Sequence, residues 1–250
     1  MTDSTRDQRR VIALAGQDRE SFLQGLVTND LGRLKTGLVY AALLSAQGKY
    51  LADFFLVPDG DRILIDVHAD LADGLLRRLS MYKLRADVLL ADSGLAVARG
   101  TGTPHAGAFA DPRHPALGWR RYVRGEVMDD ATDWDAIRVT HCIPETGVEL
   151  IPDDSYILEC GFERLNGVDF RKGCYVGQEV TARMKHKAEL RKGLATVLID
   201  GSVPVGTEIT ADGKTAGQVF TQSGGKAIAY LRFDRATGPM TAGSATVTLP

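Results

Sequence analysis

FRKGCYVGQE, Phe170–Glu179, is the stretch of this 250-residue chain that carries most of the information about fold and chemistry. One of the chain's three cysteines, Cys174, lies between two glycines, with two basic residues before it and a Gln-Glu pair after it. A thiol flanked by glycines is poorly shielded, and neighbouring cations favour its thiolate over its thiol. The stretch therefore predicts an exposed, reactive cysteine at position 174.

The same stretch opens a basic segment from Arg171 to Lys192. This segment holds seven basic and two acidic residues, whereas the whole chain has a formal net charge of −2. A basic segment on an otherwise acidic chain attracts anions even when the total charge is nearly neutral. A solvated helix face is the alternative explanation for the same charges.

The other two cysteines have ordinary surroundings. Cys142 lies in IRVTHCIP, which is typical of a strand, and Cys160 lies in YILECGF; both are expected to be small buried side chains. The three cysteines form no C-x-x-C pair, and His105, His114 and His141 are not at a metal-ligand spacing. We therefore expect neither a disulfide framework nor a metal site built by this chain alone.

Composition indicates an ordinary globular protein, with 44% hydrophobic and 25% charged residues. The N-terminal residues MTDSTRDQRRVIALAG contain no long apolar core. No later stretch approaches the roughly 18 consecutive apolar residues that a membrane-spanning helix needs. On these grounds we expect a cytoplasmic protein.

The first hundred residues predict strands interrupted by single helices. Helices are expected over QDRESFLQGLVTNDLGRL, capped near Asp18, and over ADLADGLLRRLSMYKL, capped near Asp70. The strands expected around them are RRVIALAG, LVYAALLS, YLADFFLVPDGDRILIDV with a turn at its PDGD, ADVLLADS and GLAVARG. This order indicates an α+β body.

Two later regions differ from that body. The Gly-, Pro- and His-rich residues from Thr101 to Trp119 predict an excursion over the surface. The last sixty residues contain the short β-rich runs LATVLID, TEITADGKTAGQVFTQ, KAIAYLRF and SATVTLP, separated by glycine-containing turns. Regular spacing of this kind predicts a small all-β barrel or sandwich, with a boundary near Arg191-Lys192-Gly193.

Lys172–Glu179, KGCYVGQE, resembles the K-G-C-Y-x-G-Q-E signature of the YgfZ family. These folate-binding proteins are related to the aminomethyltransferase T-protein of the glycine cleavage system. The resemblance covers nearly the whole chain, because FLQGLVTNDL, LLSAQGKYLADFFLV, YILECGFERLNGVDF and GKTAGQVFTQSGGKAIAYL are similar to other segments of the family.

The resemblance implies an α+β fold with a T-protein-like body and a small C-terminal β-barrel. The body would consist of two intertwined α+β domains that form a folate channel. In this sequence we expect a discontinuous folate-binding domain over 1–37 and 97–190, an inserted α+β domain over 38–96, and the barrel over 191–250.

The resemblance also implies a function in the assembly or repair of iron–sulfur clusters. The implied cofactor is tetrahydrofolate or another reduced folate, with no metal cluster of the protein's own. The implied partners are iron–sulfur assembly proteins or client iron–sulfur enzymes, including enzymes that modify tRNA. We expect neither direct nucleic-acid binding nor a membrane partner.

Specific residues follow from the same resemblance. Glu159 corresponds to a glutamate that faces the pterin in T-proteins, where a carboxylate can accept parallel hydrogen bonds from a ring N–H and an exocyclic amine. The basic segment would bind the anionic polyglutamate tail, and the Gln-Glu pair would hold the loop to the body. The further expected folate contacts are Lys172, Tyr175, Gln178, Glu179 and Arg183.

Two alternatives come from other functional classes. Asp53 corresponds to the catalytic aspartate of T-proteins, which allows a folate-dependent one-carbon transferase or demethylase acting on a small amine. Ala52-Asp53 nevertheless replaces the T-protein pattern Asp-Asp, and T-proteins have no cysteine in the signature and commonly read G-R-E at its end. The second alternative, a nucleic-acid-binding module, ranks last because the basic segment has little aromatic interleaving beyond Tyr175.

Overall fold

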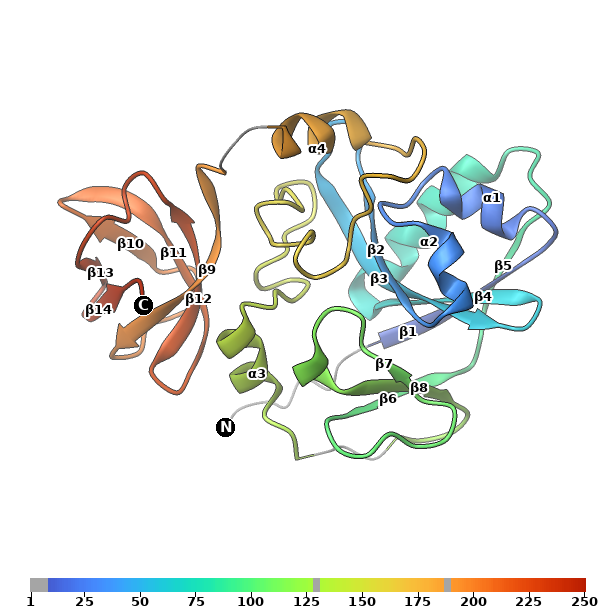
Figure 1. The fold of residues 1–250 in the computed structure, drawn as a ribbon, viewed down its shortest axis with the longest axis horizontal. Helices are drawn as coiled ribbons and strands as arrows, with labels where there is room; N and C mark the ends of the chain where they lie inside the picture. Colours follow the sequence, from blue (N-terminus) through green and yellow to red (C-terminus); the bar gives the residue numbers. More distant parts are fainter. Residues whose placement is uncertain (1–8, 128–130, 187–189) are drawn as a thin grey trace. The chain divides into compact units, whose positions relative to one another are not determined.

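The part of the chain that the computed structural model describes comprises residues 9–127, 131–186 and 190–250. It divides into two compact units, which Figure 1 draws as ribbons. The first unit contains Met1–Thr132 and Glu163–Gln178, and the second contains Asp133–Phe162 and Glu179–Pro250. None of the helices in the described ranges is long and apolar enough to span a membrane.

The first unit is built on an antiparallel five-stranded sheet in the order β2-β3-β4-β1-β5. Its strands are β1 (Arg9–Ala15), β2 (Val39–Leu44), β3 (Tyr50–Asp59), β4 (Arg62–His68) and β5 (Leu89–Asp92). The expected meander is confirmed, since β2 pairs with β3 and β3 with β4. Gly60 takes a positive φ of 61° at the β3–β4 turn, a conformation that glycine adopts without strain.

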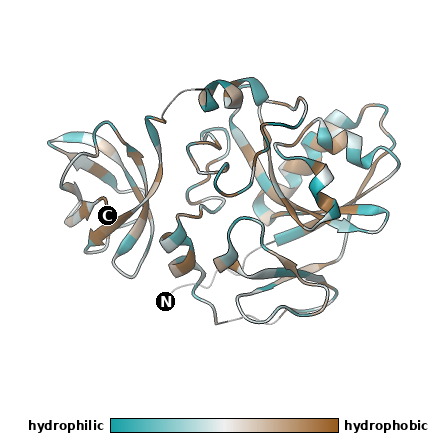
Figure 2. Ribbon diagram, viewed as in Figure 1, coloured by the Kyte–Doolittle hydropathy of each residue, from teal (hydrophilic) through white to brown (hydrophobic). Residues whose placement is uncertain are grey.

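One face of this sheet carries the hydrophobic core of the unit. Alternate residues of a strand point to the same face, and Ile12 and Leu14 of β1 both belong to this core. The core is covered by α1 (Arg19–Gln24), the 3-10 helix η1 (Leu31–Lys35) and α2 (Ala69–Lys83). Figure 2 shows brown, hydrophobic segments along the strands of this sheet.

The helices differ in extent from the expected ones. The single helix expected after β1 is divided into α1 and η1, because the backbone of Val27 forms a β-bridge with Leu43 and Thr28 N–H donates to Ala42 O at 3.0 Å. Helix α2 begins before Asp70, and His68 Nδ1 accepts from the Asp70 N–H at 3.3 Å as its N-cap. Pairing of Val27 and Thr28 with β2 thus ends α1, and the His68 side chain caps the start of α2.

The expected inserted domain over 38–96 does not have a sheet of its own. Strand β1 lies between β4 and β5, so that Ile12 is opposite Ile65 on one side and Asp92 on the other. The first strand of the chain therefore shares its sheet with residues 39–92. Pairing between strands this far apart in sequence is set by tertiary structure and leaves no local sequence signal.

A three-stranded sheet completes the first unit, with β6 (Ala96–Gly100), β7 (Phe109–Ala110) and β8 (Trp119–Val123) in the order β6-β8-β7. The 3-10 helix η2 (Pro115–Leu117) precedes β8. Leu117, Trp119 and Asp111 are buried. The expectation of a surface excursion is therefore wrong for residues 109–119, because apolar and charged side chains of this stretch pack inside the unit.

The second unit contains the expected C-terminal barrel. Six antiparallel strands close in the order β10-β11-β12-β9-β14-β13. Their bounds are β9 (Lys192–Asp200), β10 (Glu208–Ala211), β11 (Lys214–Ser223), β12 (Lys226–Arg232), β13 (Met240–Ala242) and β14 (Ala245–Thr248). Alternating residues such as Val197, Ala229 and Val247 fill the barrel.

Helix α3 (Trp134–His141) replaces the strand expected around Cys142. Asp133 caps its start by accepting a hydrogen bond from Ala136 N–H at 2.9 Å, and Cys142 ends it in the left-handed conformation. A capped start and a left-handed C-cap here outweigh the strand preference of β-branched residues. Cys142 is half-buried, whereas Cys160 is buried as expected.

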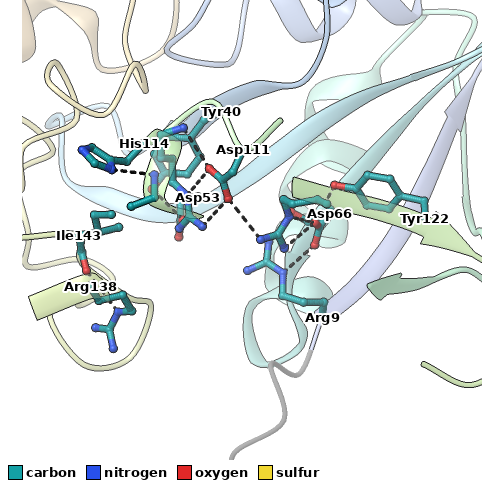
Figure 3. A network of polar contacts seen from close by, with 12 residues as sticks. Arg9, Tyr40, Asp53, Asp66, Asp111, His114, Tyr122, Arg138 and Ile143 are labelled. Atoms are coloured by element: carbon teal, nitrogen blue, oxygen red, sulfur yellow. Dashed lines mark hydrogen bonds and ion pairs between the residues drawn. The ribbon is translucent and has the colours of Figure 1, made fainter. Parts of the chain in front are cut away.

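Residues 133–162 belong to the barrel's unit because buried polar groups join them to it. Glu149 accepts hydrogen bonds from Arg138 Nη2 of α3 at 2.5 Å and from Thr221 Oγ1 of β11 at 2.6 Å. Arg138 Nε also donates to Ile143 O at 3.2 Å, and both residues are labelled in Figure 3. Buried charges paired in this way fix the position of α3 on the barrel.

Candidate functional site

The signature loop is anchored to the first unit at Lys172. The Lys172 ammonium is buried and donates to the main-chain carbonyls of Gln24, at 2.7 Å, and Val27. It also lies 5.1 Å from the centre of the Tyr175 ring, which is buried. Burial lowers the pKa of Lys172 to about 8, while the nearby carboxylates of Asp30 and Asp169 raise it. Lys172 and Tyr175 therefore support the loop from beneath.

A second anchor lies at Gly177, on the other side of the cysteine. Its φ is +81°, and a Cβ added there would lie 2.4 Å from Ser45 O and 2.8 Å from Leu44 Cβ. Only glycine permits both this backbone conformation and this close contact. The loop therefore packs directly on the turn between β2 and β3.

Cys174 is exposed between the two anchors. A Cβ added at the preceding Gly173 would meet nothing within 4 Å, so the space beside the cysteine is open. The structure thus presents Cys174 at the surface on a loop fixed at both ends. Its predicted reactivity is a separate property and stays a prediction.

The Gln-Glu pair does not hold the loop to the body in the expected way. Gln178 and Glu179 begin α4 (Gln178–Lys185), and Gln178 N–H donates to Tyr175 O at 3.2 Å. Glu179 is exposed and accepts from Arg183 Nη2 at 2.8 Å, one helical turn later. The contacts of Lys172 and Gly177 perform the anchoring that we had assigned to this pair.

The basic segment from Arg171 to Lys192 is less available to an anion than its charges suggest. The Lys172 ammonium is directed at backbone carbonyls, and Arg183 is paired with Glu179. Lys187 and Glu189 lie outside the described residues. Arg171, Arg191 and Lys192 are exposed and remain candidates for binding a polyanion.

Glu159 lies in the second unit, where the barrel holds it. Its Oε2 accepts from the Tyr230 hydroxyl at 2.6 Å, and its main-chain carbonyl accepts from Leu194 N–H at 2.8 Å. Burial, and then the bond to Glu159, raise the pKa of Tyr230. Glu159 is half-buried. Among the described residues, none donates a hydrogen bond to its second carboxylate oxygen, Oε1.

Asp53 is buried in the first unit between two tyrosines. Tyr40 Oη donates to Asp53 Oδ2 at 2.9 Å, and Tyr50 Oη donates to Oδ1 at 2.6 Å. Burial and the adjacent carboxylate raise the pKa of Tyr40, so its hydroxyl remains a donor at neutral pH. Each oxygen of Asp53 is therefore already bound within the protein.

Next to Asp53, a group of buried charges lies on the sheet face opposite the hydrophobic core (Figure 3). Asp66 accepts from Arg9 Nε at 2.6 Å, Arg120 Nη2 at 3.0 Å and Tyr122 Oη at 2.9 Å. Burial and the Asp66 carboxylate raise the pKa of Tyr122. These bonds join β1, β4 and β8.

The same group extends to the stretch before β8. Arg113 forms two hydrogen bonds with Asp111, at 3.0 and 2.8 Å. Burial opposes ionisation of Asp111, but the guanidinium of Arg113 holds its pKa below the usual value. The guanidinium carbons of Arg113 and Arg120 lie 4.8 and 4.2 Å from the centre of the Phe55 ring. Both guanidiniums therefore lie within cation–π distance of the Phe55 ring.

Sequence reasoning missed this second group of residues. The only local signal was Asp111-Pro112-Arg113, in which an acid and a base flank a proline inside a stretch that otherwise resembles a surface loop. Asp66 and Arg120 lie in strands where single charges are common. Their importance depends on contacts between residues 54 positions apart.

The expected site residues are divided between the two units. Asp53, Lys172, Tyr175 and Gln178 belong to the first unit, and Glu159, Glu179 and Arg183 to the second. Over the described ranges, no group of three or more His, Cys, Asp or Glu side chains has an arrangement that could hold a metal ion. A cluster handled by Cys174 would accordingly be cargo that needs further ligands.

Comparison with sequence families matches residues 191–250 to the family described as CAF17, C-terminal beta-barrel domain. This match covers the strands β9 to β14 that form the closed barrel. The barrel boundary near Arg191 agrees with it.

Comparison with curated proteins finds relatives named iron–sulfur cluster assembly factor IBA57. The chain is 36% identical over 219 residues to the mitochondrial IBA57 homolog of Pyricularia oryzae, covering 77% of this chain and 56% of that protein. It is 29% identical to mitochondrial IBA57 of Mus musculus over 282 residues and of Homo sapiens over 278, covering 94% of this chain and 78% of each relative. The chain thus spans little more than half of the fungal relative.

These relatives correct one expectation. They are mitochondrial proteins by name, so the comparison contradicts the expected cytoplasmic location. That expectation rested on the absence of a long apolar segment. Such an absence does not distinguish a cytoplasmic protein from a mitochondrial one.

Among solved structures, the chain is similar to the glycine cleavage system aminomethyltransferase T from Bartonella henselae. The TM-score is 0.74 at 14% sequence identity, over 96% of this chain and 82% of that one. Together with the closed barrel, this likeness confirms the expected T-protein-like α+β fold.

Proposed function

We propose that this chain, a homologue of the IBA57 proteins with a CAF17-type C-terminal barrel, acts in iron–sulfur cluster assembly. The observation that carries the proposal is the presentation of Cys174, exposed between the anchors at Lys172 and Gly177. The names of the relatives support the same function. Among the proposed clients we include iron–sulfur enzymes that modify tRNA, following the YgfZ resemblance.

Chemistry at Cys174 follows from its position. A thiolate is the form of cysteine that binds iron or attacks sulfur, and it must reach the surface to meet a partner. One thiolate cannot hold a cluster alone, so we propose that a partner protein supplies the remaining ligands and that the cluster is shared or transferred. A loop fixed at both ends holds the sulfur in place for that contact.

We further propose that the protein binds a reduced folate. Glu159 fits this cofactor, because its half-exposed carboxylate retains an oxygen to which the described residues donate nothing. A pterin ring could donate to that oxygen from its ring N–H or exocyclic amine. When bound, tetrahydrofolate supplies a carrier of one-carbon units, and the role of Glu159 would be to orient it.

The transferase alternative has less support. A group that acts on substrate must come within hydrogen-bonding distance of the reacting atoms. Asp53 is buried, and Tyr40 and Tyr50 occupy its two oxygens. A structural role for Asp53 explains these contacts without any reaction.

The test of the proposed function is complementation of cells that lack the protein. Cells carrying Cys174→Ser should lose activity of iron–sulfur enzymes and keep activity of cluster-free enzymes. Cys142→Ser is the matched control, because Cys142 is half-buried at the end of α3 and outside the signature loop. Full client activity with Cys174→Ser, at equal protein levels, would refute a role for this thiol.

A further inference from the structure

A group of large apolar side chains is exposed where helix α2 ends and strand β5 begins. The exposed fractions are 76% for Met81, 42% for Tyr82, 88% for Leu84 and 64% for Leu89. By contrast, Leu75 and Leu79 of the same helix are buried in the core. The end of α2 therefore carries apolar side chains on a second side, which the fold of the unit does not cover.

Basic residues surround these side chains. Arg77, Arg78, Lys83 and Arg85 are the charged residues from position 77 to 85, and one acidic residue, Asp87, which accepts from Gln17 N–H at 3.3 Å, follows before Leu89. Within the described part of the chain, none of the four forms an ion pair. We call the set Arg77, Arg78, Met81, Tyr82, Lys83, Leu84, Arg85 and Leu89 the α2–β5 patch.

Leu84 is not explained by the stability of the fold. It occupies the C-cap of α2 with a φ of +45° and a ψ of −103°, a combination that glycine adopts with least strain. Its side chain is almost fully exposed and so gains little from packing inside the protein. A strained backbone that directs a leucine into solvent is the kind of local cost that indicates a binding role.

The high exposure of these side chains also indicates the shape of the patch. A large side chain that is 76–88% exposed, as Met81 and Leu84 are, projects from the surface and has few neighbours beside it. A protein partner would need a pocket shaped to receive these projections. A lipid bilayer receives projecting apolar side chains without a matching pocket, and the basic side chains beside them meet the headgroups.

We propose that the α2–β5 patch docks on an anionic membrane surface. Leu84 and Met81 enter the boundary between headgroups and acyl chains, Tyr82 lies at that boundary, and the four basic residues contact anionic headgroups. Clusters of four or more Lys and Arg on an amphipathic element are typical of such binding. This peripheral contact departs from the expected lack of a membrane partner, which considered spanning segments only.

Docking by this patch leaves the signature loop accessible. Strands β2 and β5 are the two edges of the sheet, four strand spacings apart, which corresponds to about 19 Å. The loop packs through Gly177 on the turn that follows β2, whereas the patch adjoins β5. The protein could therefore be held at a membrane while Cys174 meets a partner.

Flotation with lipid vesicles tests the proposal. The full chain should float with vesicles of phosphatidylcholine and phosphatidylserine and not with phosphatidylcholine alone. Binding should fall at least about tenfold in about 1 M salt, where the Debye length is near 3 Å. Failure to float with anionic vesicles at low salt, or equal binding to neutral ones, would overturn the proposal.

Two pairs of variants connect binding to the patch. Arg78→Glu should reduce binding at least about tenfold, whereas Lys214→Glu, the same charge change at an exposed residue of the barrel, should have little effect. Leu84→Gly should weaken binding while keeping or raising the melting temperature, because glycine suits a φ of +45°. Equal binding by Arg78→Glu and Lys214→Glu would contradict the proposal.

If the α2–β5 patch instead binds a protein partner, the same experiments should give a different result. In that case vesicle binding would be absent, yet Arg78→Glu and Leu84→Gly would lower client enzyme activity in cells while both variants remained folded. That result would reject the membrane and assign the patch to a protein interface. Neither outcome depends on Cys174, so the proposed function of the thiol is tested separately.

Discussion

The ammonium of Lys172 donates to the carbonyl oxygen of Gln24 at 2.7 Å, across 148 positions of sequence. This bond connects the residue two positions before Cys174 to the end of helix α1. It makes the position of the exposed thiol depend on the first strand-helix element of the chain.

The buried Lys172 should give the protein a measurable pH dependence. Its pKa is lowered from 10.5 to about 8, so above pH 8 the folded state releases a proton that the unfolded state still holds. The free energy of unfolding should therefore rise between about pH 8 and 10.5 relative to that of Lys172→Met. Denaturant titrations at several pH values measure this difference.

Lys172→Arg is the matched control for that experiment, because arginine stays charged over the whole range. Its free energy of unfolding should lack the rise seen with lysine. Parallel pH profiles for all three proteins would show that the Lys172 ammonium is not perturbed by burial.

Gly177→Ala should destabilise the protein by about 1–3 kcal/mol, because alanine is strained at a φ of +81° and its Cβ would lie 2.4 Å from Ser45 O. Gly173→Ala is the control within the same loop, since nothing lies within 4 Å of its added Cβ. That change should stay within about 0.5 kcal/mol. Chemical denaturation decides, and equal stabilities would mean that Gly177 is not an anchor.

Alkylation should distinguish the three cysteines in the folded protein. Burial raises the pKa of the Cys160 thiol to about 12, so it should react very slowly at pH 8. Cys174 is exposed, and we expect its rate to exceed those of Cys142 and Cys160 at least about tenfold. Peptide mapping after timed labelling gives the three rates, and similar rates would remove the case for a reactive Cys174.

Asp66→Asn should destabilise the protein by about 3–5 kcal/mol, because it removes the buried carboxylate that accepts from the guanidiniums of both Arg9 and Arg120. Arg10→Met serves as the control, since Arg10 forms exposed ion pairs with Asp73 and Asp92. It should lower the free energy of unfolding far less than Asp66→Asn does, because ion pairs between exposed side chains contribute little. Thermal and denaturant unfolding test both, and equal costs would contradict the importance assigned to the buried charges.

Glu159→Ala should weaken binding of a reduced folate by roughly 1.5–3 kcal/mol, the usual range for a hydrogen bond to a charged group. Glu208→Ala is a control on the barrel, where the carboxylate accepts from the exposed hydroxyl of Thr215. Calorimetry with tetrahydrofolate measures both. No binding by the wild-type chain would reject the cofactor, and unchanged binding by Glu159→Ala would reject this residue alone.

The sequence predicted the barrel and the β2–β4 meander because their signals are local. Turn glycines recur between short apolar runs, as at Gly213 and Gly224, and the runs β10, β11 and β12 pair with their neighbours in the chain, whereas β9 pairs with β12 and β14. Helix α3 was missed because β-branched residues favour a strand, while the Asp133 cap that decides the matter lies outside the apolar run. Local preference is a weak guide when a cap opposes it.

The candidate site was predictable to a smaller extent. The exposure of Cys174 followed from its glycine neighbours. The anchoring role of Lys172 could not be predicted in the same way. Composition alone cannot distinguish a lysine that binds an anion from one that donates to main-chain carbonyls 145 and 148 positions away. The same limit applies to Asp66 and Arg120, whose meeting requires the fold.

Strand β1 lies between β4 and β5 inside its sheet, and this position has a consequence for synthesis on the ribosome. The residues of β1 leave the ribosome first, yet their two neighbours, β4 and β5, emerge only after residues 62–68 and 89–92 are made. Until then β1 has neither of its partner strands, and strands with open edges pair readily with other chains. The early nascent chain therefore depends on being kept apart from its neighbours until β4 and β5 have been made and pair with β1.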